Sequence, residues 1–366
     1  MLNILIILGG LGNEGITNSV LTYLENLNKE GLNITLGVAG VSIEQQKKRA
    51  EAIGIKVAFL PGRNTNSMRY FFSLIKIIKK EKFDIVHVHG NSATLGIDML
   101  AAKLAGAKVR IAHSRNTSCT HPLADKIMRP LFNLTYTEGF ACGEDAGKWL
   151  FGDKPFTIIP NGKKIDKYLF NEDTRVRLRN ELKIDDKTIA IGHIGVFNEQ
   201  KNHTFLVDII AELVKKDKRY TLFLFGTDNG TMAHIKEKIE SNRISDHVVF
   251  MGYKQNVNEY LSAMDIMLFP SLYEGLPNVV IEWQMAGLPC LISNTITKEC
   301  VVMDNVKMLP INEGTDIWVK EILQCAIGDR SETIAYVKDN MSSAGYNIEK
   351  NVELLREKYY ELGNVK

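Results

Sequence analysis

The sequence predicts an α/β protein with two Rossmann-like domains, each built on a parallel sheet. Short runs rich in Ile, Val and Leu alternate with longer amphipathic stretches, and this series begins a second time near residue 188. Such alternation is typical of parallel sheets that are covered by helices on both faces. A chain of 366 residues is also long for a single core, so two domains are expected.

The apolar runs place the individual elements. Strands are expected at residues 3–8, 33–39, 56–60, 84–89, 108–113 and 139–142, and then at 188–197, 220–226, 247–252, 265–270 and 288–293. Helices are expected between them, for example at 17–29, 203–215 and 254–264. Turn residues at 158–162 precede a charged stretch, which predicts domains at 1–165 and 166–346. Residues 347–363 have the pattern of an amphipathic helix, which is expected to pack back on the first domain.

Composition indicates a protein of the cytoplasm. Hydrophobic residues make up 45% and charged residues 24% of the chain, as in ordinary soluble globular proteins. The five cysteines show no C-x-x-C spacing, which suits reduced thiols. The apolar start is short, lacks a basic region and runs into glycines, so a buried strand is expected there rather than a signal peptide. No apolar run is long enough for a transmembrane helix.

Positive charge is concentrated in one part of the chain. The net charge is +2, but residues 61–130 hold twelve Lys and Arg against four Asp and Glu. This is either a solvated basic face or a region attracted to a membrane, a nucleic acid or a phosphorylated substrate. Within it, residues 69–83 form either an ordinary amphipathic helix or a helix that lies on anionic lipid. Nucleic-acid signatures are absent, so no nucleic-acid partner is expected.

A glycine loop follows the first predicted strand. Residues 10–15, Gly-Leu-Gly-Asn-Glu-Gly, fit the dinucleotide pattern G-x-G-x-x-G. A dehydrogenase also needs an acid at the end of the second strand, and none occurs there before Glu44. A dinucleotide cofactor is therefore not favoured. The remaining inference is that Gly12 and Gly15 let the backbone approach an anion or a sugar closely.

Two carboxylates in an apolar segment are the strongest functional signal. Glu274 and Glu282 are separated by seven residues, and a helix is expected at 279–286, with Pro277 in its first turn and Gly287 after its end. Backbone N–H groups at the start of that helix favour a phosphate. Carboxylates accept hydrogen bonds from neighbouring hydroxyls, which ribose and hexoses both offer. The alternative is two acids on a solvent face, which the apolar neighbours make less favourable.

This segment, "EGLPNVVIE", resembles the E-x7-E motif of the retaining GT-B glycosyltransferases of family GT4, in particular the bacterial capsule and exopolysaccharide branch. The likeness extends to residues 9–15, 84–90, 159–162 and 192–203. It implies a GT-B fold whose two parallel-sheet domains face each other across a cleft, with the acceptor on the first domain and a nucleotide-sugar donor on the second. It also implies sugar transfer to a saccharide or lipid-linked acceptor in surface polysaccharide synthesis, and hence peripheral attachment to the inner face of the cytoplasmic membrane.

The resemblance assigns roles to individual residues. Glu274 is expected to contact donor-sugar hydroxyls, Glu282 the ribose and Lys201 the diphosphate. His113 is expected near the transferring centre, although a histidine at a strand end is often only structural. His87 and His89 share one strand face, and at least one of them is expected in the cleft. The remaining donor-binding residues implied are Gly275, Leu276, Asn278, Val279, Gly12, Gly15 and Asn161.

One position departs from the family pattern. The family usually carries an arginine shortly before the lysine that matches Lys201, and here the arginine position holds Val196 while Lys201 remains. A catalytically weak or silent nucleotide-sugar-binding protein is therefore an alternative, and a sugar-nucleotide epimerase is another. The sequence shows no D-x-D pair and no His/Cys cluster, so neither a metal nor a cofactor is expected.

Overall fold

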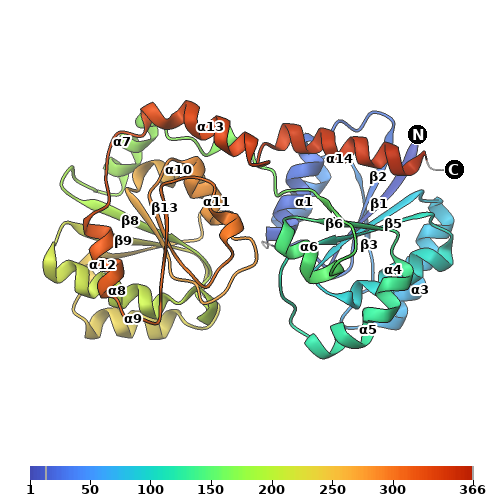
Figure 1. Ribbon diagram of the computed structural model, residues 1–366, viewed down its shortest axis with the longest axis horizontal. Helices are drawn as coiled ribbons and strands as arrows, with labels where there is room; N and C mark the ends of the chain where they lie inside the picture. The colour runs from blue at the N-terminus through green and yellow to red at the C-terminus, as the bar shows by residue number, and fades with distance from the viewer. Residues whose placement is uncertain (13–14, 365–366) are drawn as a thin grey trace. The chain divides into compact units, whose positions relative to one another are not determined.

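The computed structural model describes residues 1–12 and 15–364, which form two compact units. Unit 1 comprises Met1–Lys163 and the segment from Gly345 onward, and unit 2 comprises Lys164–Ala344. Figure 1 shows the elements of each unit along the chain. Asn13 and Glu14 of the predicted glycine loop lie outside the described residues.

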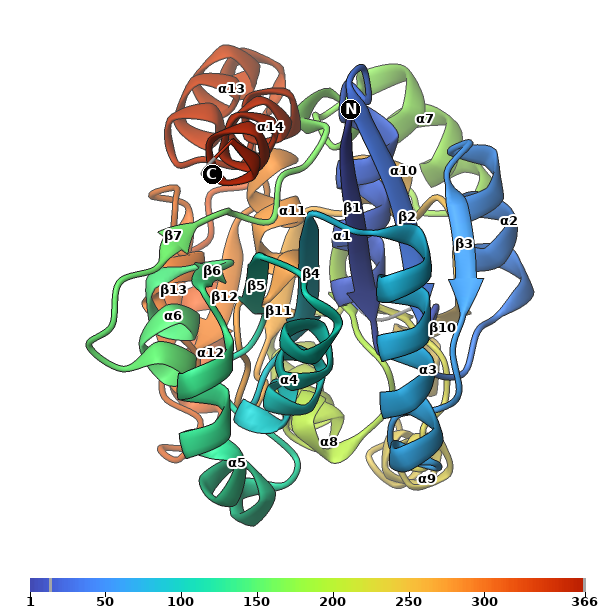
Figure 2. The same cartoon turned by 90° about the vertical axis from the view of Figure 1, so that its right-hand side faces the viewer.

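Unit 1 is built on a seven-stranded parallel sheet with the order β3-β2-β1-β4-β5-β6-β7. Figure 2 shows these strands side by side, with β3 at one edge and β7 at the other. The order reverses between β1 and β4, as in doubly wound sheets that bind ligands at this point. The strands are β1 (Leu2–Leu8), β2 (Leu32–Val38), β3 (Lys56–Phe59), β4 (Ile85–Gly90), β5 (Val109–Ser114), β6 (Glu138–Ala141) and β7 (Thr157–Ile158).

Helices cover both faces of this sheet. On one face α1, α2 and α14 enclose a core that includes Ile4, Ile6 and Ile111, and on the other α3 to α6 enclose a core that includes Leu5, Val86 and Ala112. The bounds are α1 (Gly15–Asn26), α2 (Glu44–Ala52), α3 (Ser67–Glu81), η1 (Ala93–Leu95), α4 (Gly96–Ala105), α5 (Pro122–Thr135), α6 (Glu144–Phe151) and α14 (Ile348–Gly363). Because successive strand residues point to opposite faces, the near-continuous apolar runs supply both cores.

Unit 2 repeats the plan with six parallel strands in the order β10-β9-β8-β11-β12-β13. They are β8 (Ile189–Ile194), β9 (Tyr220–Phe225), β10 (Val248–Gly252), β11 (Ile266–Phe269), β12 (Cys290–Ser293) and β13 (Val306–Leu309). The helices are η2 (Ile165–Lys167), α7 (Glu172–Glu181), η3 (Glu199–Lys201), α8 (His203–Lys216), α9 (Met232–Ser241), η4 (Ser245–His247), α10 (Val257–Ala263), α11 (Asn278–Met285), η5 (Lys298–Cys300), α12 (Asp316–Leu323), η6 (Ser331–Thr333) and α13 (Ile334–Ser343). The two parallel sheets confirm the predicted fold class.

The C-terminal helix α14 belongs to unit 1. Asn347 begins it by accepting hydrogen bonds from the backbone N–H groups of Glu349 and Lys350, which is a normal N-cap. Its apolar stripe, which includes Val352 and Tyr359, is buried in the same core as α1. Among the residues that the structure describes, no helix combines the length and apolar composition that crossing a bilayer requires.

Candidate functional site

The predicted residues of unit 2 meet at the carboxyl ends of β8 and β11, where the strand order of the sheet reverses. Lys201 ends the short η3 turn that follows β8, and Glu274 lies in the turn after β11. Three hydrogen bonds join the two turns: Leu272 N to Gln200 O (2.8 Å), Gln200 Nε2 to Tyr273 O (2.9 Å) and Asn202 Nδ2 to Pro270 O (3.1 Å). The backbone therefore fixes how the two turns face each other.

Lys201 and Glu274 form a direct ion pair in this position. The Nζ–Oε1 distance is 2.6 Å, and the side chains are only 15% and 10% exposed. The Lys201 ammonium also lies 4.7 Å from the centre of the Phe269 ring, within cation–π range. The pair thus places two opposite charges, both largely shielded from solvent, at the crevice where doubly wound sheets bind ligands.

Helix α11 begins four residues after Glu274. Pro277 precedes it and provides no side-chain cap, so the backbone N–H groups at Asn278 and Val279 are not capped by a side chain and suit an anion. Gly275, Leu276, Asn278 and Val279 are all half-buried along this turn, and Glu282 is half-buried one turn inside the helix. Gly287 follows the helix with φ +68°, as expected for a glycine after a helix end.

Two buried histidines beside Lys201 were not identified from the sequence. His193 on β8 and His203 at the start of α8 lie with ring centres 4.7 Å apart, and His193 Nδ1 donates to Leu268 O at 2.9 Å. Burial lowers the pKa of both, that of His203 to about 4, and the charge of Lys201 lowers both further. Both rings are therefore neutral at physiological pH. The segment "GHIGVFNEQKNH" held this signal, since it places two histidines around Lys201.

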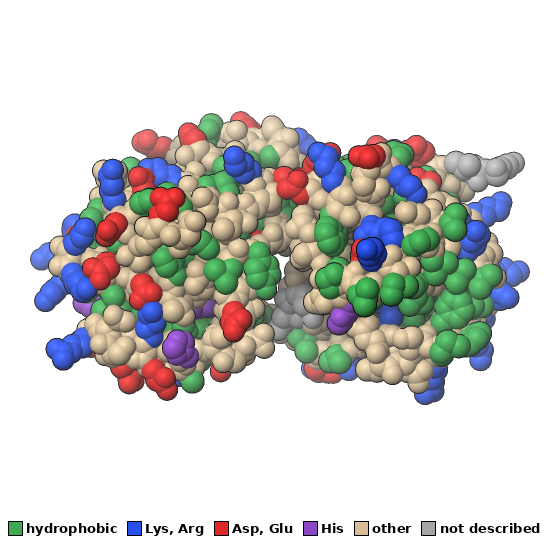
Figure 3. All heavy atoms as spheres, turned by 60° about the horizontal axis from the view of Figure 1, so that its bottom comes forward, with side chains coloured by type: hydrophobic (Ala, Val, Ile, Leu, Met, Phe, Trp, Pro, Cys, Tyr) green, Lys and Arg blue, Asp and Glu red, His purple; other side chains and the backbone are tan. Residues whose placement is uncertain are grey.

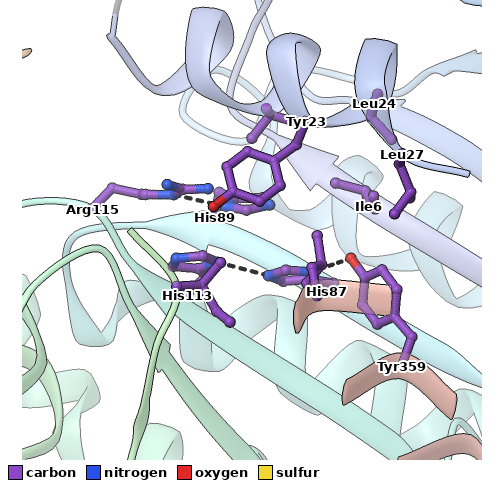
Figure 4. A pocket seen from close by; sticks show the side chains of 12 residues that line it. Ile6, Tyr23, Leu24, Leu27, His87, His89, His113, Arg115 and Tyr359 are labelled. Atoms are coloured by element: carbon purple, nitrogen blue, oxygen red, sulfur yellow. Dashed lines mark hydrogen bonds between the residues drawn. The ribbon is translucent and has the colours of Figure 1, made fainter. Parts of the chain in front are cut away.

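In unit 1, His113 lies within a buried group of three histidines (Figure 4). His87 and His89 on β4 and His113 on β5 are each at most 4% exposed, and one ring nitrogen of each lies within 4.8 Å of the others. The strand register pairs His89 with His113, so both strands direct these side chains to one face of the sheet. The sequence shows no such cluster, because these histidines are distant in sequence and become neighbours only in the parallel sheet. The role of His113 near the transferring centre stays a prediction.

Asn161 lies beside this group in unit 1. Its Oδ1 accepts hydrogen bonds from Arg115 Nη1 (2.7 Å) and Ser19 Oγ (3.0 Å). Arg115 also donates through Nε to His89 Nδ1 at 3.0 Å. Burial lowers the pKa of Arg115, and among the described residues no carboxylate forms an ion pair with it. Nothing in the sequence indicated this role for Arg115.

The glycine loop is explained in part by packing. A Cβ at Gly10 would lie 2.6 Å from Val41 O, and Leu11 N donates to that same oxygen at 3.0 Å. Gly10 is thus needed where the loop after β1 meets the loop after β2. Gly12 is half-buried, and Gly15 begins α1 and is exposed. Their predicted contact with a ligand stays a prediction.

Residues 69–81 lie in α3, which buries Tyr70, Leu74 and Ile78 against the sheet and exposes its lysines, and Lys82 caps its C-terminal end. Helix α5 contacts α4, as does α3. Together the three helices expose six large apolar side chains, each at least 55% exposed: Met68, Phe72, Leu104, Leu123, Ile127 and Leu134. Figure 3 shows apolar side chains gathered on this unit, with Lys and Arg at the margin.

Known proteins resemble the chain in both sequence and fold. Residues 13–163 match the model of Glycosyltransferase Family 4, and residues 188–326 match that of Glycosyl transferases group 1. EpsF of Bacillus subtilis, a protein assigned to the glycosyltransferases, is 29% identical over 97% of this chain and 96% of its own. An Escherichia coli UDP-Gal:alpha-D-GlcNAc-diphosphoundecaprenol alpha-1,3-galactosyltransferase is 24% identical over 81% of this chain and 80% of its own.

Among solved structures, HepE of Anabaena in complex with UDP and glucose aligns with a TM-score of 0.79 at 15% identity, covering 99% of this chain and 100% of that one. Fold and sequence matches together define the class: the chain is a glycosyltransferase of the GT-B fold. Within this class it is GT4-like, because one glycosyltransferase model matches part of each unit.

Proposed function

We propose that this glycosyltransferase moves a sugar from a nucleotide-sugar donor to a saccharide or lipid-linked acceptor in the synthesis of a surface polysaccharide, with retention of the anomeric configuration. The observation that carries the proposal is the Lys201–Glu274 ion pair beside the start of α11. The Escherichia coli relative supports the lipid-linked alternative, because its name specifies a diphosphoundecaprenol acceptor. The acceptor role falls to unit 1 and the donor role to unit 2.

The donor-binding roles follow from the chemistry of each group. The diphosphate competes with Glu274 for Lys201 and also accepts hydrogen bonds from the N–H groups at Asn278 and Val279. Glu274 then accepts hydrogen bonds from hydroxyls of the transferred sugar, and Glu282 from the ribose diol. The ion pair of the free protein keeps both charges compensated until the donor arrives, which limits the cost of shielding them from water.

The reaction breaks the bond between the anomeric carbon and the diphosphate oxygen, which takes the electron pair. An oxocarbenium-like centre develops on the sugar, the oxygen of an acceptor hydroxyl forms the new bond to the anomeric carbon, and the proton of that hydroxyl passes to the departing diphosphate. Lys201 and the dipole of α11 stabilise the negative charge that grows on the diphosphate. These groups supply the electrostatic role that a divalent metal plays in other transferases, so the proposed reaction needs no metal ion.

The proposal includes peripheral attachment to an anionic membrane on the cytoplasmic side. The six exposed apolar residues on α3, α4 and α5 lie among exposed lysines. Four of these lysines are close together in the sequence, namely Lys76, Lys79, Lys80 and Lys82. Each lysine near an anionic leaflet contributes roughly 1 kcal/mol, and buried apolar side chains add to this. A lipid-linked acceptor is presented at just such a surface.

Donor binding is tested by thermal stabilisation with UDP-, GDP- and ADP-sugars, beginning with the UDP-sugars that the HepE complex suggests. One nucleotide class should raise the melting temperature of the wild type, and Glu282→Ala should abolish most of the rise. No stabilisation by any nucleotide sugar would contradict the proposal. Formation of an altered nucleotide sugar without an acceptor would establish the epimerase instead, and binding with neither reaction would establish a silent binding protein.

Membrane attachment is tested by sedimentation with anionic vesicles at low and high salt. The variant with Lys76, Lys79, Lys80 and Lys82 changed to Ser should bind more weakly at low salt, and so should Leu123→Ser combined with Ile127→Ser. A matched control changes four exposed lysines of unit 2 to Ser, namely Lys215, Lys216, Lys218 and Lys236. Equal binding by all of these proteins would show that this surface is only solvated.

A further inference from the structure

A line of hydrogen bonds runs from the C-terminal helix to His113 (Figure 4). Tyr359 Oη on α14 lies 2.7 Å from His87 Nδ1, and His87 Nε2 lies 3.0 Å from His113 Nδ1. Tyr359 is fully buried, and 272 residues separate it from His87. The other ring nitrogen of His113, Nε2, is buried and has no hydrogen-bond partner among the described residues.

Which group donates in each of these hydrogen bonds follows from where each hydrogen can find an acceptor. If Tyr359 donates to His87 Nδ1, then His87 carries its hydrogen on Nε2 and donates to His113 Nδ1, which leaves the hydrogen of His113 on Nε2. In the reverse direction the hydroxyl hydrogen of Tyr359 is left without an acceptor, because among the described residues only His87 forms a hydrogen bond with this hydroxyl. A buried hydroxyl without a partner is costly, so the first direction is favoured.

A second contact places the hydrogen of His89 on Nε2 as well. The Arg115 guanidinium can only donate, so His89 Nδ1 is an acceptor and His89 carries its hydrogen on Nε2. Burial lowers the pKa of all three histidines, that of His87 to about 3, and the charge of Arg115 lowers them further. The three rings are therefore neutral.

This arrangement suits an oxygen and not a metal ion. The Nδ1 lone pair of each histidine is already engaged, by Tyr359, Arg115 or His87, and a metal ligand must offer a lone pair. The nearby guanidinium also repels a cation. The cavity that these side chains line has a volume of only about 10 Å³, which is at the lower limit for holding a single water molecule.

We propose that Tyr359 and His87 are positioning residues that hold His113 in the neutral form with its hydrogen on Nε2. His113 then donates a hydrogen bond to an oxygen of the saccharide substrate, directly or through the one water that the cavity admits. It neither removes a proton nor binds a metal. The contact with substrate rests on the proposed function, whereas the position of the hydrogen does not.

The hydrogen position is measured by NMR of protein labelled with ¹⁵N-histidine, with the His113 signals assigned by their loss in His113→Gln. The wild type should show a protonated Nε2 and an unprotonated Nδ1 at His113. Tyr359→Phe keeps the ring packing but removes the hydroxyl, and should give a mixture of the two forms. A protonated Nδ1 in the wild type, or unchanged signals in Tyr359→Phe, would overturn the proposal.

Tyr23→Phe is the matched control. Tyr23 is a second buried tyrosine of the same cavity, but its hydroxyl donates to Pro160 O and not to a histidine. Its removal should leave the His113 signals as in the wild type. If Tyr23→Phe alters the His113 signals as much as Tyr359→Phe does, general loosening of the cavity explains the effect. The positioning role of Tyr359 and His87 is then refuted.

Transfer kinetics test the contact with substrate separately. The Gln side chain can place an N–H near the position of His113 Nε2, so His113→Gln should keep kcat within about fivefold, whereas His113→Leu should lose tenfold or more by losing a hydrogen bond. A general base would instead lose about 10²- to 10⁴-fold in both variants. That outcome, or equal kcat in all proteins, overturns the contact, while the NMR result stands even for a protein without measurable transfer.

Discussion

Acidification from pH 7.5 to pH 5.5 should destabilise unit 1 more than unit 2, because buried neutral histidines are unequally divided between them. Unit 1 holds His87, His89 and His113, and unit 2 holds His193 and His203. All five have a folded-state pKa lowered by burial. At pH 7.5 these histidines are mostly neutral in both the folded and the unfolded chain, so they contribute little.

The size of the effect follows from the proton uptake of the unfolded chain. Below its ordinary pKa near 6.5 each unfolded histidine gains a proton that the folded one refuses, so stability falls as the pH falls. Between pH 7.5 and pH 5.5 this amounts to about 1.4 kcal/mol per histidine. Unit 1 should thus lose about 4 kcal/mol and unit 2 about 3 kcal/mol, large fractions of the 5–15 kcal/mol typical of a domain.

Urea unfolding at the two pH values, followed by tryptophan fluorescence, measures this effect. Trp149 reports on unit 1, and Trp283 and Trp318 report on unit 2. Trp149→Phe leaves only the signals of unit 2, and changing the other two to Phe leaves only that of unit 1. A loss below about 1.5 kcal/mol in unit 1 would mean that at least two of its histidines accept protons in the folded state. The neutral cluster around His113 would then be refuted.

Three further predictions concern the donor site. Glu282→Ala should weaken nucleotide binding roughly 10- to 100-fold through the lost carboxylate hydrogen bonds, while Glu274→Ala should mainly lower kcat. If both variants keep the nucleotide affinity of the wild type, measured by calorimetry, and its kcat, these roles are refuted. Val196 is 40% exposed, so Val196→Arg should fold normally and raise kcat by a charge-assisted contact to the diphosphate. Unchanged or lower kcat would show that another group already fills this role. EDTA should leave transfer unaffected because Lys201 and α11 stabilise the leaving group, and activity lost to EDTA and restored by Mn²⁺ would contradict this.

The sequence predicted most of the strands, including the short edge strand β3, but not the edge strands β7 and β13. The alternation of apolar runs located β1 and β8 within a few residues, because a strand buried on both faces needs an unbroken apolar run. The edge strands β7 and β13 went unrecognised, since they have only two and four residues and are largely exposed or half-buried. An edge strand needs neither length nor continuous apolarity.

The candidate site was predictable only where its residues are close in sequence. The spacing of Glu274 and Glu282 on one turn and helix is visible in the letters alone. The ion pair of Glu274 with Lys201 depends on two turns that the strand order brings together, and it was not anticipated. Tyr359 is the extreme case: its contact with His87 requires α14 to return to unit 1, and no local pattern indicates the partner of a single buried tyrosine.

Transfer of a radiolabelled sugar from the stabilising nucleotide sugar to lipid-extractable or polysaccharide acceptors is the most direct measurement of the central claim. The wild type should label the acceptor and release the nucleoside diphosphate in equal amounts, and Lys201→Met and Glu274→Gln should each lose most of this transfer while remaining folded. Undiminished transfer in both variants would contradict the assignment of the reaction to the Lys201–Glu274 pair beside α11.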